Sequence, residues 1–357
     1  MKKYKFALIG CGHISYKHIN AINKIENAKL EAVCDIKKEK AKKKGEENNI
    51  PWYTDYHKML ENENVDIVNI LVESGKHAEV FKDIIKYKKH IIIEKPMALT
   101  LSDADDMIRI SDEAGIKLFV VKQNRFNAPV QLLRRALEEG RFGKLILGTV
   151  RVRWHRDQAY YDQDYWRGTW KYDGGVFTNQ ASHHLDLLEW MMGDVESVFA
   201  KSDTFLHKIE VEDTGVALFR FTNGALGTFE ATTCTNPVDL EGSISILGEN
   251  GTVEIGGFAV NEMKVWNFKD KKDYDKEAFN SNYIPENVYG YGHELYIRNV
   301  LKAIENNTRG LVEGIEGRRS LELINAIYES IETEKEIFLR FKPKKCKLGN
   351  EWNEKNI

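Results

Sequence analysis

Lys95 stands where a side chain can take part in chemistry. It follows the apolar run of residues 90–93 and is itself followed by Pro96. A lysine at the carboxyl end of a strand can hydrogen-bond substrate hydroxyls, or it can release its proton if burial and a nearby cation lower its pKa. The alternative is a solvated surface lysine. Because proline fixes the chain directly after Lys95, the sequence favours a side chain that points into a cleft.

The first 35 residues have a pattern typical of dinucleotide binding. An apolar run at residues 6–9 leads into Gly10 and Gly12, a helical pattern follows, and a second apolar run ends at Asp35. Gly10 permits a tight turn, and Gly12 lets the backbone approach a pyrophosphate that the next helix binds with its N-terminal amides. Asp35 lies about 20 residues past Ser15, the third motif position, where a carboxylate can bind an adenosine ribose. It would also repel a 2′-phosphate, which favours NAD over NADP; the alternative is an ordinary turn between strand and helix.

The elements that must position these groups alternate along the first third of the chain. Apolar runs typical of buried strands are separated by amphipathic helical patterns. Such alternation predicts an α/β Rossmann domain, a doubly wound parallel sheet, over residues 1–122, with ligands at the carboxyl ends of its strands. Beyond the first two strands we expect strands at 65–72, 90–93 and 117–122 and helices at 77–87 and 102–114, the last with Ser102 as its cap.

The second half of the sequence has a different pattern. From residue 144 on, apolar and polar residues alternate and Asn-Gly turns separate the runs, as hairpins require. We expect an α+β domain over residues 123–357 with a large, mainly antiparallel open sheet, a helix near 175–192 in the cleft, and a C-terminal segment that can pack back on the first domain. The other expected elements are strands at 145–154, 214–221, 225–233, 242–247 and 337–341, helices at 292–306 and 314–334, and a mobile surface loop at 267–286.

Composition limits the class of protein. At 357 residues the chain is long enough for about two domains. Its 52 basic and 55 acidic side chains exclude a globally basic nucleic-acid binder, and its four cysteines lack the spacing of a disulfide framework or structural zinc site. No apolar run is long enough to span a membrane, and the N-terminal residues do not resemble a signal peptide. We therefore expect a cytoplasmic protein with neither nucleic acid nor membrane as a partner.

Several stretches resemble the glucose–fructose oxidoreductase and inositol dehydrogenase (Gfo/Idh/MocA) family. They are Gly10-Cys11-Gly12, Ser74-Gly75-Lys76-His77, Glu94-Lys95-Pro96 and residues 173–186. The resemblance implies a Rossmann domain that binds NAD, a second domain that binds the substrate, and the activity of an NAD-dependent sugar dehydrogenase. The cofactor-binding residues that we expect are Gly10, Gly12, His13, Ile14, Asp35, Ser74, His77, Glu94, Lys95, Gln123 and Arg167.

The resemblance extends to one subgroup of that family. Residues 123–127, 165–171 and 179–184 are similar to the UDP-2-acetamido-2-deoxy-glucuronate 3-dehydrogenases of bacterial lipopolysaccharide and O-antigen synthesis, and residues 289–294 and 316–320 resemble them more weakly. This implies oxidation of the 3-hydroxyl of that nucleotide sugar to a 3-keto sugar, with NAD as oxidant. It also implies 2-oxoglutarate as a co-substrate that regenerates NAD, and a homodimer or homotetramer formed through the outer face of the open sheet.

Lys95, His183 and Asn179 are the predicted catalytic residues. Oxidising a hydroxyl requires a base for its proton and a nicotinamide carbon close to the departing hydride. An imidazole, whose ordinary pKa is about 6.5, suits the base, and Lys95 can stabilise developing alkoxide charge. Many family members have aspartate where this chain has Asn179, which can orient a group but cannot act as a base. His183 and His184 do not share a helix face, so we expect no metal site.

A nucleotide-sugar uronate carries a diphosphate and a carboxylate, and arginines bind both well. The predicted substrate-binding residues are Lys95, Arg125, Arg153, Arg156, Arg167, Lys171, Asn179 and His183. Three alternatives to the leading function are another sugar or inositol dehydrogenase, a nucleotide-sugar 3-ketoreductase that uses NADPH, and a non-catalytic regulator that senses dinucleotides. Asp35 argues against the second, and the presence of both Lys95 and His183 argues against the third.

Overall fold

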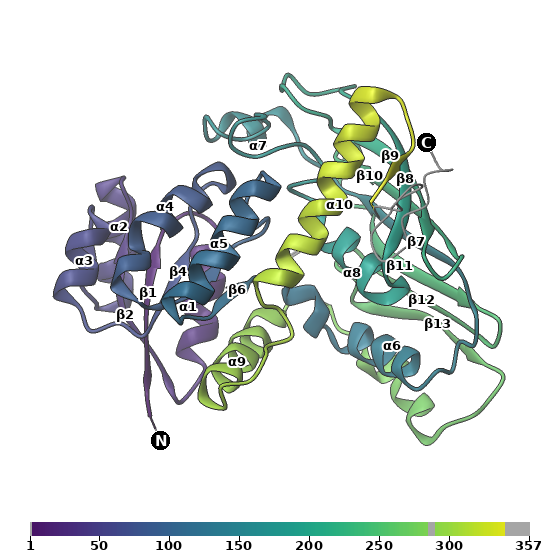
Figure 1. Cartoon of the computed structure of the whole chain (residues 1–357), viewed down its shortest axis with the longest axis horizontal. Helices are drawn as coiled ribbons and strands as arrows, with labels where there is room; N and C mark the ends of the chain where they lie inside the picture. Colours follow the sequence, from purple (N-terminus) through teal and green to yellow (C-terminus); the bar gives the residue numbers. More distant parts are fainter. Residues whose placement is uncertain (1, 285–289, 340–357) are drawn as a thin grey trace, which may run out of the picture.

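The computed structural model describes residues 2–284 and 290–339 and has two lobes, each built around one sheet (Figure 1). The sheet of the first lobe is parallel, with strand order β3-β2-β1-β4-β5-β6. Because β1 lies between β2 and β4, the winding reverses there, and a crevice forms at the carboxyl ends of these strands. The strands are β1 (Tyr4–Ile9), β2 (Ala28–Cys34), β3 (Trp52–Tyr53), β4 (Ile67–Ile70), β5 (His90–Ile93) and β6 (Leu118–Val120).

Helices connect these parallel strands, as predicted. The cap expected at Ser102 is wrong, because the last of these helices begins one residue earlier, at Leu101. Thr100 has the extended backbone of an N-cap residue, and its side-chain oxygen accepts a hydrogen bond from the backbone N–H of Asp103. The helices are α1 (Ser15–Asn23), α2 (Lys38–Asn48), α3 (Tyr56–Asn62), α4 (His77–Ile84) and α5 (Leu101–Ala114).

The second lobe contains an eight-stranded sheet in the order β13-β12-β11-β7-β10-β9-β8-β14. Its pairings are antiparallel except for that of β7 with β10, which confirms the predicted mainly antiparallel open sheet. The strands are β7 (Leu145–Arg153), β8 (Val195–Asp203), β9 (Thr214–Phe221), β10 (Leu226–Thr232), β11 (Glu241–Gly248), β12 (Gly251–Gly256), β13 (Glu262–Phe268) and β14 (Ile337–Phe338).

Helices of the second half cover one face of this sheet and also return to the first lobe. Helix α8 (Ser182–Met192) packs on β7 and β11, and α10 (Gly314–Thr333) contacts both β8 and α5. Helix α9 (Gly292–Glu305) packs beside α1, and its Tyr296 and Ile297 join the apolar core of the first lobe. The chain therefore crosses between the lobes more than once. The other helices are α6 (Ala128–Glu138) and α7 (Gln158–Asp162).

Some predicted elements differ from the structure. The helix expected near 175–192 begins only at Ser182, because residues 174–181 form turns. The expected loop at 267–286 includes the end of β13 and two short 3₁₀ helices, Asp273–Glu277 and Phe279–Ser281, while residues 285–286 lie outside the described part. The sequence patterns did not indicate α2, β3, α3, α6, α7, β8, β12 or β13.

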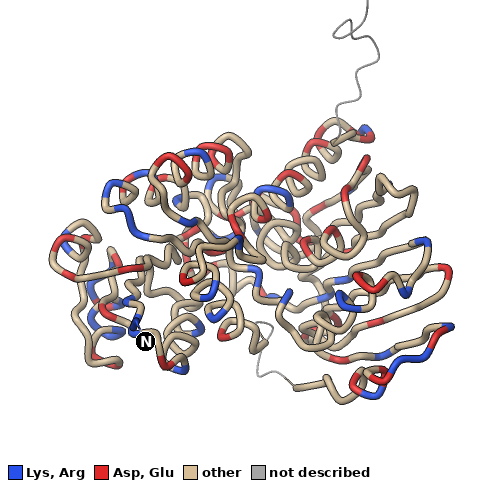
Figure 2. The backbone as a smooth tube through the Cα atoms, turned by 60° about the horizontal axis from the view of Figure 1, so that its bottom comes forward, with Lys and Arg blue, Asp and Glu red and all other residues tan. Residues whose placement is uncertain are grey.

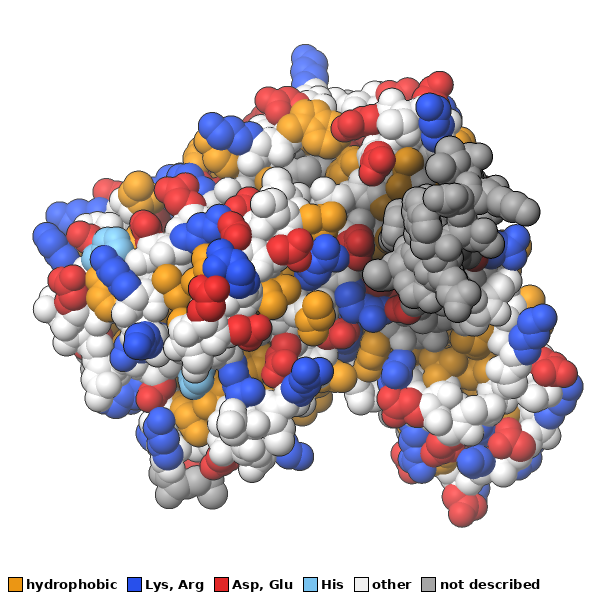
Figure 3. All heavy atoms as spheres, viewed as in Figure 1, with side chains coloured by type: hydrophobic (Ala, Val, Ile, Leu, Met, Phe, Trp, Pro, Cys, Tyr) orange, Lys and Arg blue, Asp and Glu red, His pale blue; other side chains and the backbone are white. Residues whose placement is uncertain are grey.

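Charged residues are spread over both lobes. Figure 2 shows basic and acidic residues interspersed along the backbone, and Figure 3 shows charged and apolar side chains mixed on the face seen in Figure 1. This mixture agrees with a net charge of −3. In the described ranges, 2–284 and 290–339, no helix is long and apolar enough to cross a membrane.

Candidate active site

A cavity of about 1310 Å³ opens at the carboxyl ends of the first lobe's strands and continues to the start of α8. Its volume exceeds that of most small-molecule sites, so it has room for a dinucleotide together with a substrate. The predicted catalytic residues and the predicted cofactor-binding residues all line it. These are Gly10, Gly12, His13, Ile14, Asp35, Ser74, His77, Glu94, Lys95, Gln123, Arg167, Asn179 and His183.

The glycine turn after β1 has the geometry that a dinucleotide motif requires. Gly10 has φ +106°, and a Cβ added to it would lie 2.6 Å from the carbonyl oxygen of Leu71. At Gly12, by contrast, an added Cβ would have no protein atom within 4 Å. The space beside Gly12 is thus part of the cavity. Ser15 Oγ donates to the carbonyl of Gly12 at 2.7 Å, which fixes the turn against α1.

Asp35, at the end of β2, helps to hold this turn. Its Oδ2 accepts a hydrogen bond from the backbone N–H of Cys11 at 2.8 Å, and its Oδ1 accepts one from the N–H of Lys37 at 2.8 Å. Each carboxylate oxygen can accept a further bond, and Asp35 lines the cavity. The ribose contact expected for it stays a prediction.

Glu94 and Lys95 follow β5 and line the cavity. Glu94 Oε1 is hydrogen-bonded to His18 Nε2 at 2.8 Å, and its Oε2 accepts from the backbone N–H of Lys95. Burial alone would raise the pKa of Glu94, but the hydrogen bond and charge of His18 hold it at about 2. Glu94 is therefore a fixed anion next to Lys95. The Asn69 side-chain nitrogen is hydrogen-bonded to His18 Nδ1, which holds the imidazole in place.

The ammonium of Lys95 reaches across to the second lobe. Lys95 Nζ donates to the backbone carbonyl of Asn179 at 2.6 Å, and the Asn179 side chain donates to Asp173 Oδ1 at 2.5 Å. Burial lowers the pKa of Lys95, and the negative charges of Glu94 and Asp173 oppose this shift. Lys95 is thus a partly buried amine whose protonation depends on nearby carboxylates, which suits a group that handles a substrate proton.

His183 also lines the cavity. Its Nε2 lies 3.0 Å from the side-chain nitrogen of Gln123. Burial, together with the charges of Lys95 and Lys122, lowers the pKa of His183 well below the usual value, so the imidazole is neutral at physiological pH. A neutral imidazole can accept a proton. Asn179 precedes α8 rather than lying on it, so Asn179 and His183 do not share one helix face as predicted.

A buried glutamate supports the turn that carries Asn179. Glu212 Oε1 accepts hydrogen bonds from the backbone N–H of Phe177 and from Tyr328 Oη, whereas its Oε2 has no partner among the described residues. A Cβ at Gly175 would lie 2.1 Å from Glu212, so a glycine is required there. Burial raises the pKa of Glu212 to about 7.

We expect Glu212→Gln to stabilise the protein at pH 8 but much less at pH 5. The folded protein holds the Glu212 proton up to a pKa of about 7, compared with an ordinary value of 4.5, so the wild type loses stability as pH rises through this window. A neutral glutamine removes that loss. Thermal unfolding should show a midpoint about 2–6 °C higher for the variant at pH 8. Exposed Glu210→Gln is the control, and an equal effect at both pH values would contradict the prediction.

Comparison with known proteins assigns the chain to a family. Residues 4–122 match the description "Oxidoreductase family, NAD-binding Rossmann fold", and residues 130–254 match "GFO/IDH/MocA C-terminal domain". The chain belongs to the Gfo/Idh/MocA family of oxidoreductases. With the site described above, it is an NAD-dependent sugar or polyol dehydrogenase. The cavity fits the cofactor, since Gly12 leaves it open and both His293 ring nitrogens and Gln123 Oε1 lack partners among the described residues that line it.

Individual family members are similar over nearly the whole chain. A WlbA dehydrogenase from Bordetella pertussis, crystallised with NADH and UDP-GlcNAcA, is 42% identical with a TM-score of 0.92, covering 96% of this chain and 99% of that one. The WlbA enzyme from Chromobacterium violaceum, with the same ligands, is 42% identical with a TM-score of 0.90, covering 96% and 98%. A myo-inositol 2-dehydrogenase from Thermotoga maritima is 27% identical over 350 residues, which is 94% of this chain and 98% of that enzyme.

Four basic residues predicted to bind the substrate do not line the cavity of this family member. Three of them are hydrogen-bonded to acidic side chains. Arg125 is buried and bonded to Asp186 and Glu316. Arg153 is bonded to Glu230, and Arg156 is bonded to Asp239. Lys171 is exposed, with its Nζ over the ring of Tyr172. Arg167 does line the cavity, as do the other predicted substrate-binding residues, Lys95, Asn179 and His183. We therefore leave out of the proposed site the four basic residues that do not line the cavity.

Sequence reasoning missed several residues of the cavity. Asp173 stands directly before the pair Gly174-Gly175, and this glycine pair could have drawn attention to it. His293 comes from α9, which no local pattern placed near the site. The segment around α7 also covers the cavity, tied to the first lobe by Asp164 with Lys37 and by Tyr165 with Glu73. Such contacts join residues more than 90 positions apart and leave no local signal.

Proposed function

We propose that the protein oxidises the 3-hydroxyl of UDP-2-acetamido-2-deoxy-glucuronic acid to the 3-keto sugar, with NAD as oxidant. The observation that carries the proposal is that Lys95, Asn179 and His183 all line one dinucleotide-sized cavity, where Lys95 binds the carbonyl of Asn179 and His183 lies beside Gln123. The 42% identity to two enzymes crystallised with UDP-GlcNAcA supports this substrate over an inositol, for which the similarity is 27%.

The chemistry divides between the cofactor and the side chains. When bound, NAD accepts the hydride from the alcohol carbon. The hydroxyl proton must leave with it, and neutral His183 can accept that proton while Lys95 binds the same oxygen. Asn179 contributes its carbonyl, which holds Lys95 Nζ at 2.6 Å. Arg167 lines the cavity and suits a diphosphate or a carboxylate, because a guanidinium can bind two oxygens of either group with parallel hydrogen bonds.

The test is a substrate comparison with purified protein. UDP-2-acetamido-2-deoxy-glucuronate and NAD should yield NADH and a 3-keto sugar, whereas myo-inositol and UDP-GlcNAc, which lacks the carboxylate, should be poor substrates. Turnover of inositol in preference to the nucleotide sugar would overturn the proposal. We further propose that 2-oxoglutarate regenerates NAD, so that its addition should produce 2-hydroxyglutarate. The 3-keto product would serve bacterial lipopolysaccharide and O-antigen synthesis.

We also propose that the open sheet mediates a homodimer or homotetramer. Its outer face exposes Val216 and Leu218 of β9 and Leu226 of β10, which are 52%, 59% and 48% exposed. An uncovered apolar sheet face of this kind marks an association surface.

Leu218→Glu should therefore lower the oligomeric state. A glutamate buried between two sheets would lose hydration without gaining a partner, at a cost of several kcal/mol. Light scattering coupled to size-exclusion chromatography measures the mass. Leu295→Glu is the matched control, because Leu295 is 51% exposed on α9, away from this face. Equal masses for wild type and Leu218→Glu would refute the role of this face.

A further inference from the structure

Asp173 is a buried carboxylate that the proposed chemistry has not used. It lines the cavity and is 2% exposed. Its Oδ1 accepts a hydrogen bond from Asn179 Nδ2 at 2.5 Å, and its Oδ2 accepts one from the backbone N–H of Gly168 at 2.9 Å. A carboxylate in this setting is costly to bury, and no direct ion pair with it is found among the described residues. The two accepted hydrogen bonds account for an acid rather than an amide at this position, but not for placing its negative charge in the cavity.

The charges around Lys95 suggest a reason. Glu94 and Asp173 raise the pKa of Lys95 against the effect of burial, while Lys122 and Arg167 lower it further. Glu94 is already held as an anion by His18. Asp173 is therefore the carboxylate near Lys95 whose charge can change near neutral pH, because burial raises its pKa to about 6 against the hydrogen bond from Gly168 and the charge of Lys95.

The geometry links the two groups through one residue. Lys95 Nζ binds the backbone oxygen of Asn179, and Asp173 binds the side-chain nitrogen of the same residue. Asn179 is thus hydrogen-bonded to both the lysine and the acid. An asparagine at 179 cannot supply a negative charge, so that charge comes from Asp173 instead.

We propose that Asp173 is a positioning residue of the reaction: it fixes Asn179, and it supplies the buried negative charge that controls whether Lys95 carries its proton. This proposal rests on the proposed function for its role in turnover, but the coupling between Asp173 and Lys95 is a property of the protein alone. With Asp173 ionised, Lys95 is held as an ammonium that can bind the substrate oxygen. With Asp173 neutral, Lys95 loses its proton more readily.

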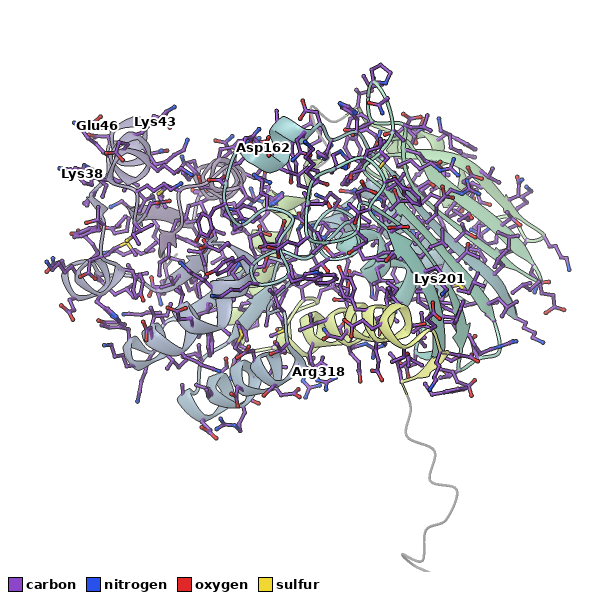
Figure 4. The ribbon with its side chains drawn as sticks, turned by 90° about the horizontal axis from the view of Figure 1, so that it is seen from above. Lys38, Lys43, Glu46, Asp162, Lys201 and Arg318 are labelled. Atoms are coloured by element: carbon purple, nitrogen blue, oxygen red, sulfur yellow. The ribbon has the colours of Figure 1, made fainter. Side chains whose placement is uncertain are left out.

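The test measures Lys95 directly and needs no sugar. Purified full-length protein is acetylated with trace acetic anhydride from pH 5 to 11, and mass spectrometry follows each lysine, so that the midpoint of each curve reports its pKa. Asp173→Asn should lower the Lys95 midpoint and raise the unprotonated fraction of Lys95 at pH 7 severalfold. Exposed Lys38, which lies on α2 at the outer surface of the first lobe (Figure 4), should be unchanged.

The control variant is Asp162→Asn. Asp162 lies on α7, is exposed and bonds to Gln158, so it should leave the Lys95 curve as in the wild type. An unchanged Lys95 midpoint in folded Asp173→Asn would overturn the proposal, whichever sugar the enzyme uses. Failure of the nucleotide sugar to react, with the shift present, would instead refute the proposed function.

The wild type supplies a second measurement in case Asp173→Asn does not fold. The logarithm of the labelling rate of an isolated amine rises with pH at unit slope below its pKa. If Asp173 ionises near pH 6 and then holds the proton on Lys95, the slope for Lys95 must fall below one around that pH and recover above it. A straight line through pH 6 for Lys95, with Lys38 also straight, would contradict the coupling.

Discussion

Replacing Lys95 with alanine should reduce the rate of sugar oxidation by about 10²- to 10⁴-fold and leave NAD bound. The physical reason is that Lys95 Nζ lines the cavity, where it can bind the substrate oxygen, and that its partial burial reduces the screening of its charge. Alanine removes both the charge and the hydrogen bond. Glu94, the anion beneath it, loses a partner as well, which adds to the loss.

Steady-state kinetics measure the rate of sugar oxidation, and NADH fluorescence measures binding of the cofactor. The turnover number should fall, whereas the dissociation constant for NADH should change by less than about tenfold, because Lys95 is one of many residues that line a large cavity. Lys38→Ala is the matched control, since Lys38 is exposed on the outer surface of α2. Wild-type turnover by folded Lys95→Ala would exclude this lysine from the mechanism.

The part of the site that could be predicted from sequence is the part encoded by short segments. The turn Gly10-Cys11-Gly12, Asp35 at the end of the second strand and Lys95 before Pro96 each need only a strand and its next few residues. The parallel sheet then brings these strand ends together, because all carboxyl ends of a parallel sheet lie on one edge. The alternation of strands and helices was sufficient to predict that sheet.

What the sequence could not show are pairings between distant residues. Arg125 and Arg153 had the chemistry of substrate ligands, yet Asp186 and Glu230 lie 61 and 77 positions further on and bind them. Asn179 and His183 have the spacing of one helix face, but hydrogen bonds from Asn179 to Gly175 and from Ala181 to Val176 form turns that delay the helix. Asp173 acquires its environment only when these turns fold against Lys95.

In the turn Gly10-Cys11-Gly12, substitution of Gly10 should lower the stability of the fold, whereas substitution of Gly12 should weaken binding of the cofactor. Gly10→Ala places a methyl group 2.6 Å from the Leu71 carbonyl oxygen, in a backbone conformation of φ +106° that alanine avoids. Backbone strain of this kind costs about 1–3 kcal/mol, which corresponds to roughly 2–10 °C in unfolding temperature. Gly12→Ala meets no protein atom within 4 Å, so its unfolding temperature without cofactor should match the wild type.

For binding of NAD, Gly12→Ala is the variant that should have the larger effect. The methyl group of Gly12→Ala projects into space that the cofactor's diphosphate needs, so the dissociation constant for NAD should rise by at least about tenfold. Thermal unfolding with and without NAD, together with calorimetric titration, separates the two effects, and each variant serves as the other's control. Wild-type NAD affinity in Gly12→Ala would mean that the diphosphate does not lie against this turn. That result would also remove the reason for a glycine at position 12, because the protein itself leaves room there for a side chain.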